Sequence, residues 1–236
     1  MKIERLDILR CDAGWRMFSF VKMATTDGIV GWSEFNESFG SQGLGGVIEE
    51  LAPLVIGMDP RASELIVAKL QVLSRQSRGG VMQQAIAAIE NAVLDIRGKE
   101  AGKPVAALFG GPIRTQIPVY WSHFGTYRVG GRKGAEMPRI HTLDQLARHA
   151  AEVKALGFKG LKTNILRIGK DGSLGQFAPG FGRHAGWPEL NWDNAVLAEM
   201  AQQLQAIRDA VGPEMGIHLD LNFHFRTEGF IRMAEA

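Results

Sequence analysis

Lys162-Thr163-Asn164 and Asp220-Leu221-Asn222 each close a short apolar run, residues 158–161 and 215–219, that is typical of a buried strand. Alternate residues of a strand point to the same side, so we expect Lys162 to share a face with Asn164, and Asp220 with Asn222. At the carboxyl ends of parallel strands, paired polar side chains are typical of a barrel active site. The competing interpretation is that these polar residues cap the strand ends at the protein surface, because that arrangement would give the same sequence pattern.

The second half of the chain alternates strand and helix patterns. Strands are predicted over residues 117–121, 158–161 and 215–219, and helices begin near Thr142, before Val196 and near Arg226. Three strand–helix units in succession predict a parallel sheet with right-handed crossovers. The turns from helix to strand are tight, whereas two long loops, residues 124–141 and 166–191, leave the carboxyl ends of strands. This asymmetry is typical of the active-site face of a TIM-type barrel.

The first half reads as a small α+β domain. Asp27-Gly28 is a strong hairpin signal between the predicted strands 18–23 and 29–32, and residues 2–10 add a third strand. Asp59-Pro60 predicts the start of a helix, with Asp59 as the N-cap, and residues 80–98 predict a buried helix. We therefore expect an N-terminal α+β domain over residues 1–115 and a partial (β/α) barrel over residues 116–236.

The composition excludes several classes of protein. Hydrophobic residues make up 45% of the 236 residues, enough for a core, and a net charge of +2 is too small to indicate nucleic-acid or membrane-surface binding. One loop is basic, but it lacks interleaved aromatic residues, which favours a solvated loop or attraction of an anionic substrate; its members are Arg128, Arg132, Lys133 and Arg139. A single cysteine and no bilayer-length apolar stretch are consistent with a cytoplasmic protein.

Three further segments complete a pattern with the two polar strand ends. They are residues 26–34 (TDGIVGWSE), 87–99 (AAIENAVLDIRGK) and 104–111 (PVAALFGG). Together the five segments resemble, in the right order, the enolase superfamily in its mandelate racemase and muconate lactonizing enzyme branch. The first three resemble the hairpin of the capping domain, the signature helix and the segment that leads into the barrel. Lys162-Thr163-Asn164 lies where the family has Lys-x-Lys, and Asp220-Leu221-Asn222 matches its Asp-x-Asn.

The resemblance implies removal of the proton alpha to a carboxylate, with bound Mg²⁺ stabilising the resulting enediolate. Asp220 matches the family's first metal ligand, and a hard carboxylate oxygen suits Mg²⁺. Lys162 matches the first lysine, which contacts the substrate carboxylate or supports the base, and Asn222 would lie beside it as a hydrogen-bonding neighbour. A divalent cation and an ammonium group both stabilise negative charge on carboxylate oxygens.

The resemblance also points to residues that would contact a substrate. Residues 12–18 and 36–46 match the segments of the capping domain that close over the substrate, which suggests specificity residues among Trp15, Phe18, Glu37 and Ser38. His123, at the end of the first barrel strand, and His224, as an auxiliary acid, are further candidates. Ordinary packing is the competing interpretation for the loop residues, and a surface histidine is the competing interpretation for His224.

Asn164 departs from the family, which has a second lysine at this position. An amide cannot act as a general base near neutral pH, so racemisation by two bases is disfavoured, whereas one base and a metal ion still support loss of water from a hydroxy acid. The favoured function is therefore dehydration of a sugar acid, with Lys162 and Asn164 as the catalytic pair. A racemase, epimerase or cycloisomerase of the same branch is the alternative, and a non-catalytic remnant that binds a partner or ligand is a third.

The length of the chain leads to the last expectation, which concerns how much of the barrel it contains. A complete eight-stranded barrel takes about 250 residues, and only three βα units follow the capping domain here. We therefore expect a C-terminally incomplete member of the family, with the other Mg²⁺ ligands beyond residue 236 and no activity from this portion alone. Members of the family commonly pair or form octamers, so a homo-oligomer is expected.

Overall fold

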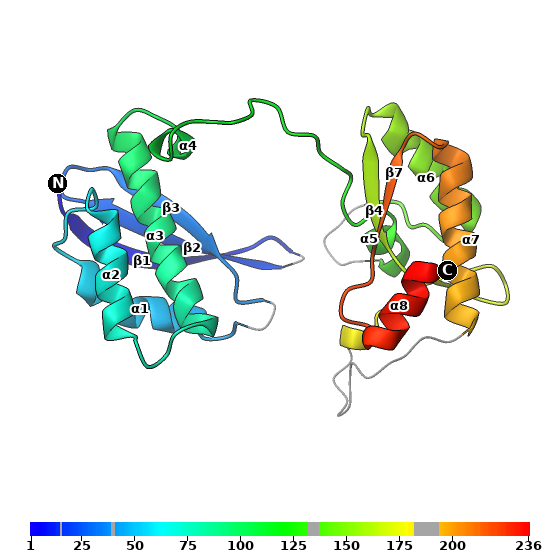
Figure 1. Ribbon diagram of the computed structural model, residues 1–236, viewed down its shortest axis with the longest axis horizontal. Coiled ribbons are helices and arrows are strands. Elements are labelled where there is room, and N and C mark those ends of the chain that lie inside the picture. Colours follow the sequence, from blue (N-terminus) through cyan, green and yellow to red (C-terminus); the bar gives the residue numbers. More distant parts are fainter. Residues whose placement is uncertain (15, 39–40, 132–136, 182–193) are drawn as a thin grey trace. The chain divides into compact units, whose positions relative to one another are not determined.

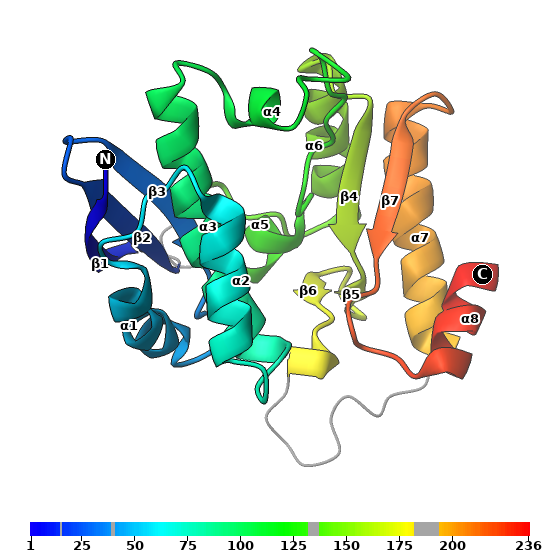
Figure 2. The same cartoon turned by 60° about the vertical axis from the view of Figure 1, so that its left-hand side comes forward.

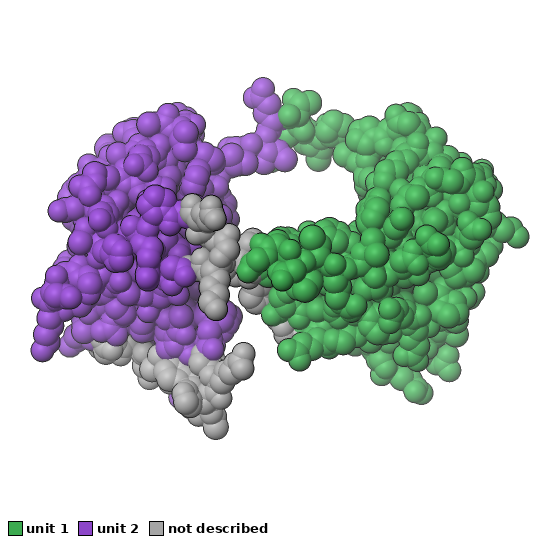
Figure 3. Space-filling model, turned by 180° about the vertical axis from the view of Figure 1, so that it is seen from behind, with its two compact units in different colours: residues 1–115 green, residues 116–236 purple. Residues whose placement is uncertain are grey.

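The computed structural model describes residues 1–14, 16–38, 41–131, 137–181 and 194–236. The chain divides into two compact units, Met1–Thr115 and Gln116–Ala236, which Figure 3 shows in different colours. Each unit has its own hydrophobic core and is described by itself. No helix in these described ranges is both long enough and apolar enough to cross a membrane.

The first unit contains an antiparallel sheet of three strands, in the order β1 (Ile3–Asp12), β2 (Met17–Thr25) and β3 (Val30–Phe35). The predicted hairpin is confirmed, because β2 and β3 pair directly around a turn in which Gly28 has a φ of 84°. Every second residue of β2 from Ser19 to Thr25 is buried, which directs one face of the sheet to the core.

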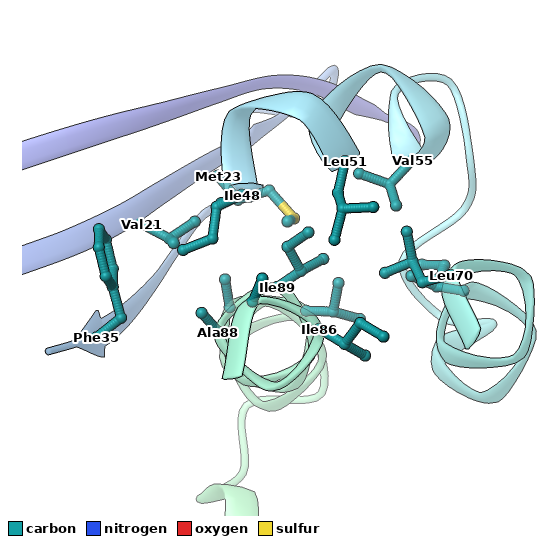
Figure 4. Packing of buried hydrophobic residues seen from close by; sticks show 14 of the residues in the cluster. Val21, Met23, Phe35, Ile48, Leu51, Val55, Leu70, Ile86, Ala88 and Ile89 are labelled. Atoms are coloured by element: carbon teal, nitrogen blue, oxygen red, sulfur yellow. The ribbon is translucent and has the colours of Figure 1, made fainter. Parts of the chain in front are cut away.

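Helices cover that face of the sheet. They are α1 (Leu44–Val55), α2 (Ser63–Leu73) and α3 (Gly80–Glu100), followed by the short α4 (Val105–Leu108). Figure 4 shows Ile86 and Ile89 of α3 pointing toward side chains of β2 and α1, and all of these residues belong to the buried core. The predicted buried helix over residues 80–98 is thus confirmed at the centre of this unit.

The helix start predicted at Asp59-Pro60 is wrong. Helix α2 begins at Ser63, and its N-cap is Ala62, which makes no side-chain hydrogen bond. The carboxylate of Asp59 is already engaged, because it accepts hydrogen bonds from the backbone N–H and the guanidinium of Arg61. A local side-chain bond has therefore displaced the predicted cap.

The second unit contains a parallel pair, β4 (Gly160–Asn164) and β7 (Gly216–Asp220), as the alternating pattern predicts. Helices α6 (Leu143–Ala155) and α7 (Asn194–Val211) lie beside these strands in Figures 1 and 2, and α8 (Thr227–Glu235) follows β7. Leu161 of β4, Leu146 of α6 and Ile207 of α7 are fully buried in one core cluster. The fold is that of an α+β capping domain followed by the first part of a TIM-type barrel, units 1–3.

The first barrel strand is shorter than predicted. Instead of a strand over residues 117–121, only Trp121 forms a parallel bridge, to Leu161 of β4. The bridge rests on two hydrogen bonds, from the Trp121 N–H to the Gly160 carbonyl and from the Lys162 N–H to the Trp121 carbonyl, at 3.0 and 2.8 Å. Pro118 has no N–H to extend the ladder, and Ile117 and Val119 are 76% and 65% exposed.

The two long loops contain short elements that the sequence did not predict. Helix α5 (Thr126–Gly130) follows the Trp121 bridge, and its Val129 is buried in the second core. After β4, the strands β5 (Leu166–Ile168) and β6 (Leu174–Gln176) form a small hairpin, and a 3₁₀ turn, η1 (Pro179–Phe181), follows. Helix α5 and the hairpin of β5 and β6 each follow the carboxyl end of a strand segment, so they lie at the edge of the sheet that carries the candidate site.

Candidate active site

The two polar strand ends meet at the carboxyl edge of the parallel pair. Leu161 and Thr163 are fully buried on the side of β4 that faces the helices, and Lys162 projects from the other side, with 23% of its side chain exposed. The Nζ of Lys162 lies 3.0 Å from the Oδ2 of Asp220. The structure therefore brings together the ammonium and the carboxylate on which the sequence interpretation depends.

The environment keeps both members of this pair charged. The hydrogen bond to Asp220 raises the pKa of Lys162 above its ordinary value, so the side chain is a cation and not a base at neutral pH. Partial burial acts to raise the pKa of Asp220, but the hydrogen bonds from Lys162 and from the Asn222 N–H, with the nearby positive charge of Lys162, more than offset it. The net result is a lowered pKa and a carboxylate that is ionised at neutral pH.

Asn164 is buried at the same carboxyl edge of the sheet and makes hydrogen bonds through both ends of its amide. Its Oδ1 accepts a hydrogen bond of 2.9 Å from the hydroxyl of Thr126 in α5, and its Nδ2 donates one of 3.0 Å to the backbone carbonyl of Asp220. The amide thus connects the loop after the first barrel segment to the end of β7. Such an amide holds neighbours in place, which is a different role from accepting a proton.

Gln203 contributes hydrogen bonds at the end of β4, and the sequence analysis did not predict it. It is fully buried on α7, where its Oε1 accepts a hydrogen bond from the Leu166 N–H at 2.9 Å. Its Nε2 donates to the Thr163 hydroxyl and to the Asn164 carbonyl, at 3.0 and 2.9 Å. One side chain therefore satisfies the backbone and side-chain polar groups where β4 ends. The only signal in the sequence is a glutamine at helical spacing from Met200 and Ile207, on the apolar face of α7.

Replacing Gln203 with leucine should lower the free energy of unfolding by about 2–4 kcal/mol. The substitution leaves the buried Leu166 N–H without its partner and removes one of the hydrogen bonds to the Asn164 carbonyl, and an unsatisfied buried group carries the full cost of desolvation. Urea denaturation followed by circular dichroism measures this change. Gln202→Leu is the matched control, because Gln202 is exposed on the same helix. Equal effects of the two substitutions would contradict a structural role for the Gln203 amide.

Asn222 does not continue the strand alternation, so the expectation that it shares a face with Asp220 is wrong. Strand β7 ends at Asp220, and Asn222 is exposed with a φ of 50°. The reason is local, since the Asn222 N–H turns back to donate to the Asp220 Oδ1 at 2.9 Å. His123 has a φ of 51° and also lies two residues past the end of its strand segment. These are the only non-glycine residues with positive φ among those that the structure describes, and both lie at this edge.

His224 is not the surface histidine that the sequence left open. It is only 2% exposed, and its Nδ1 accepts a hydrogen bond of 3.0 Å from the Gly180 N–H. Burial lowers the pKa of His224, although the charge of Asp220 acts in the opposite direction. The neutral ring therefore connects the turn at Pro179–Phe181 to the segment after β7. His123 is exposed instead, and its ring stacks on Tyr127 at a centroid distance of 4.4 Å.

The candidate residues of the capping unit are engaged within that unit. Phe18 stacks on Phe20, with ring centroids 6.5 Å apart. Glu37 accepts a hydrogen bond from the Gly45 N–H at 2.9 Å and forms an ion pair with Arg10 at 3.0 Å. The hydroxyl of Ser38 donates to the Met17 carbonyl at 3.1 Å, and Trp15 lies outside the described residues.

The described part of the chain contains no group of three or more His, Cys, Asp or Glu side chains that could hold a metal ion. Asp220 by itself suits a hard cation, because its carboxylate is ionised. Each of its oxygens accepts one hydrogen bond, so each keeps a lone pair that a cation could use. The described residues therefore fit Mg²⁺ with one ligand, and they do not form a complete site.

The comparisons with known proteins agree with this architecture. The family described as "Mandelate racemase / muconate lactonizing enzyme, N-terminal domain" matches residues 12–110. The chain is 32% identical over 166 residues to a D-galactonate dehydratase of Xanthomonas euvesicatoria pv. vesicatoria, a match that covers 70% of this chain and 38% of that protein. The chain thus spans well under half the length of this curated relative.

Two solved structures from Burkholderia xenovorans strain LB400 are similar over nearly the whole chain. Both are described as a "putative L-alanine-DL-glutamate epimerase". The first is 42% identical, with a TM-score of 0.92, and the match covers 100% of this chain and 59% of that one. The second, bound to magnesium and fumarate, is 41% identical, with a TM-score of 0.90, and the match covers 99% and 58%.

An α+β unit followed by βα units with polar strand ends defines the class of capped, TIM-type barrel proteins. Within this class, the chain belongs to the enolase superfamily, in its mandelate racemase and muconate lactonizing enzyme branch. The family recognised in the sequence motifs is thereby confirmed.

Proposed function

We propose that the protein carrying this chain removes the proton alpha to the carboxylate of a small organic acid, and that the reaction is the dehydration of a sugar acid. The observation that supports this proposal best is the ion pair of Lys162 and Asp220, 3.0 Å apart at the carboxyl edge of a parallel sheet. The similarity to D-galactonate dehydratase supports the same substrate class.

Each residue of the edge has a distinct part in this proposal. The Lys162 ammonium binds the substrate carboxylate and stabilises the negative charge that develops on its oxygens when the alpha proton leaves. Asp220 provides one carboxylate ligand for Mg²⁺, which would add positive charge at the same oxygens. Asn222 and His123, both exposed beside the pair, contact the substrate. His224 holds the Pro179–Phe181 turn and the segment after β7 together.

Asn164 is best described as a positioning residue. Its two hydrogen bonds, to Thr126 and to the Asp220 carbonyl, hold the ends of β4 and β7 in register beside Lys162. Since neither Asn164 nor the charged Lys162 can accept the alpha proton, one base from elsewhere in the protein is required. In dehydration this base takes the proton from C2, the C3–O bond breaks as the departing hydroxyl takes up a proton and leaves as water, and the resulting enol tautomerises to a 2-keto acid.

Epimerisation is the second candidate, because the Burkholderia structures, which are described as an epimerase, have the higher sequence identity. Epimerisation returns a proton to the opposite face of the same carbon, which needs a second proton donor or an exchange at one base. The absence of a base at residue 164 disfavours it. Cytoplasmic location and homo-oligomerisation remain expectations for the whole protein.

Incubation of the whole protein with D-galactonate and Mg²⁺ in deuterated water separates these candidates. Dehydration should yield a 2-keto acid, detected by mass spectrometry and by NMR. L-Ala-L-Glu, incubated in parallel, should remain unchanged. Deuterium incorporation with inversion in the dipeptide, without any keto acid from the sugar acid, would establish epimerisation instead. No deuterium incorporation and no product across a panel of sugar acids would contradict the proposal.

A further inference from the structure

A second polar site lies where α6 meets Arg128 of α5 and residues 138–140. It is a surface pocket with a volume of about 200 Å³, well above the roughly 30 Å³ that one water molecule occupies in the liquid. The side chains that carry its polar groups are Arg128, Arg139, Gln145, Arg148, His149 and Glu152. Neither the family membership nor the proposed reaction explains this concentration of guanidinium groups.

The lining of this pocket is rich in hydrogen-bond donors and positive charge. Among the described residues that line the pocket, three guanidinium groups are opposed by the carboxylate of Glu152 alone, and the side chain of Glu152 is 67% exposed. Gln145 uses its Oε1 to accept a hydrogen bond from the His141 N–H, so the group that remains for a ligand is its NH₂ donor. In the described part of the chain, the exposed Arg148 has no ion-pair or hydrogen-bond partner.

Arg128 and His149 form the inner wall of the pocket. The Arg128 Nη1 lies 3.0 Å from the His149 Nδ1, and its Nε donates to the Pro138 carbonyl at 2.7 Å. His149 is 8% exposed, and its ring stacks on Phe124 at a centroid distance of 5.0 Å. Burial lowers the pKa of His149, and the charge of Arg128 adds to this effect, whereas Glu152 opposes it. The imidazole is therefore neutral at neutral pH and offsets none of the surrounding positive charge.

Like charges gathered around one pocket repel one another unless an anion lies between them. Guanidinium groups bind tetrahedral oxyanions particularly well, because their planar N–H donors match pairs of oxygen atoms. We propose that this pocket binds a phosphate-type oxyanion, either inorganic phosphate or the phosphate group of a small monoester. The proposal does not depend on the reaction assigned to Lys162 and Asp220, because all of its residues lie on α5, α6 and the segment between them.

The test is a calorimetric titration of the 236-residue chain with inorganic phosphate at constant ionic strength, repeated with glycerol 3-phosphate. Saturable binding is expected. Equal affinities would assign recognition to the phosphate group alone, and tighter binding of the monoester would assign part of it to the organic group. The same titration followed by NMR should show the pKa of His149 rising on saturation, because the anion offsets the charge of Arg128.

Two charge reversals distinguish a site from general attraction. Arg148→Glu should weaken phosphate binding about tenfold or more, through loss of a charge-assisted hydrogen bond. Arg114→Glu changes the net charge equally at an exposed residue that does not line the pocket, and it should leave the affinity unchanged. A response to phosphate that does not saturate, or equal weakening by both substitutions, would overturn the proposal.

Discussion

Replacing Asp220 with asparagine should reduce turnover by the whole protein by roughly a hundredfold to a thousandfold, if the proposed reaction is correct. The substitution removes the charged metal ligand and the ion pair with Lys162, whose Nζ lies 3.0 Å from the Oδ2 of Asp220. Groups that stabilise charge developing in a transition state typically have effects of this size. Turnover measured at saturating sugar acid and at several Mg²⁺ concentrations gives both the loss of rate and any loss of metal affinity.

Glu214→Gln is the matched control for this substitution. Glu214 is an exposed carboxylate just before the opposite end of β7, so its loss should leave turnover unchanged. Thermal denaturation of both variants separates a catalytic effect from unfolding. If Asp220→Asn keeps full activity while it remains folded, the assignment of Asp220 as a metal ligand is wrong, and with it the proposed site.

Replacing Gly31 with alanine should destabilise the first unit by about 3 kcal/mol. Gly31 is a buried residue of β3, and an added Cβ would lie 2.2 Å from the Ala92 carbonyl oxygen and 2.6 Å from the Ile96 Cγ1 of α3. Because the first of these atoms belongs to the helix backbone, the clash cannot be relieved by rotating a side chain. Either α3 moves away from the sheet, or β3 loses its place beside β2.

Gly46→Ala is a suitable comparison for the Gly31 variant. Gly46 lies within α1, and a Cβ there would meet nothing within 4 Å. Alanine is favoured over glycine in a helix, so this variant should be unchanged or slightly more stable, by up to about 1 kcal/mol. Urea denaturation of the 236-residue chain measures both variants. A Gly31→Ala variant as stable as the unsubstituted chain would show that the close approach of β3 to α3 is not required.

The predictions that succeeded rest on local patterns. A strand points alternate residues to one face, so Lys162 and Asn164 could be placed on the same side of β4 from the sequence alone. The spacing of apolar residues likewise predicted α3 and α7, and Thr142 predicted the start of α6, where its hydroxyl accepts the Gln145 N–H. The order of these elements was enough to predict a parallel sheet and its polar edge.

The predictions that failed involve competition between partners. Asp59 was predicted to cap α2, but its carboxylate accepts a hydrogen bond from the guanidinium of Arg61 instead. Asn222 was predicted to extend an alternating strand, but its N–H turns back to Asp220. Residues 117–121 have the composition of a strand, yet only Trp121 pairs with β4. For Asp59 and Asn222 a local hydrogen bond replaced the predicted one, and for residues 117–121 Pro118 has no N–H to extend the ladder.

The sequence by itself determined the order of the longer strands and helices, except for the first barrel strand, together with the two polar strand ends and the family, because periodicity and motifs are properties of neighbouring residues. Only the tertiary structure decided that Gln203 completes the hydrogen bonds where β4 ends, that Asn164 joins Thr126 to Asp220, and that His224 is buried. Each of these facts depends on residues at least 37 positions apart in the chain or on burial. A buried polar group is satisfied by whatever the packing brings within about 3 Å, and packing is not encoded in any one segment.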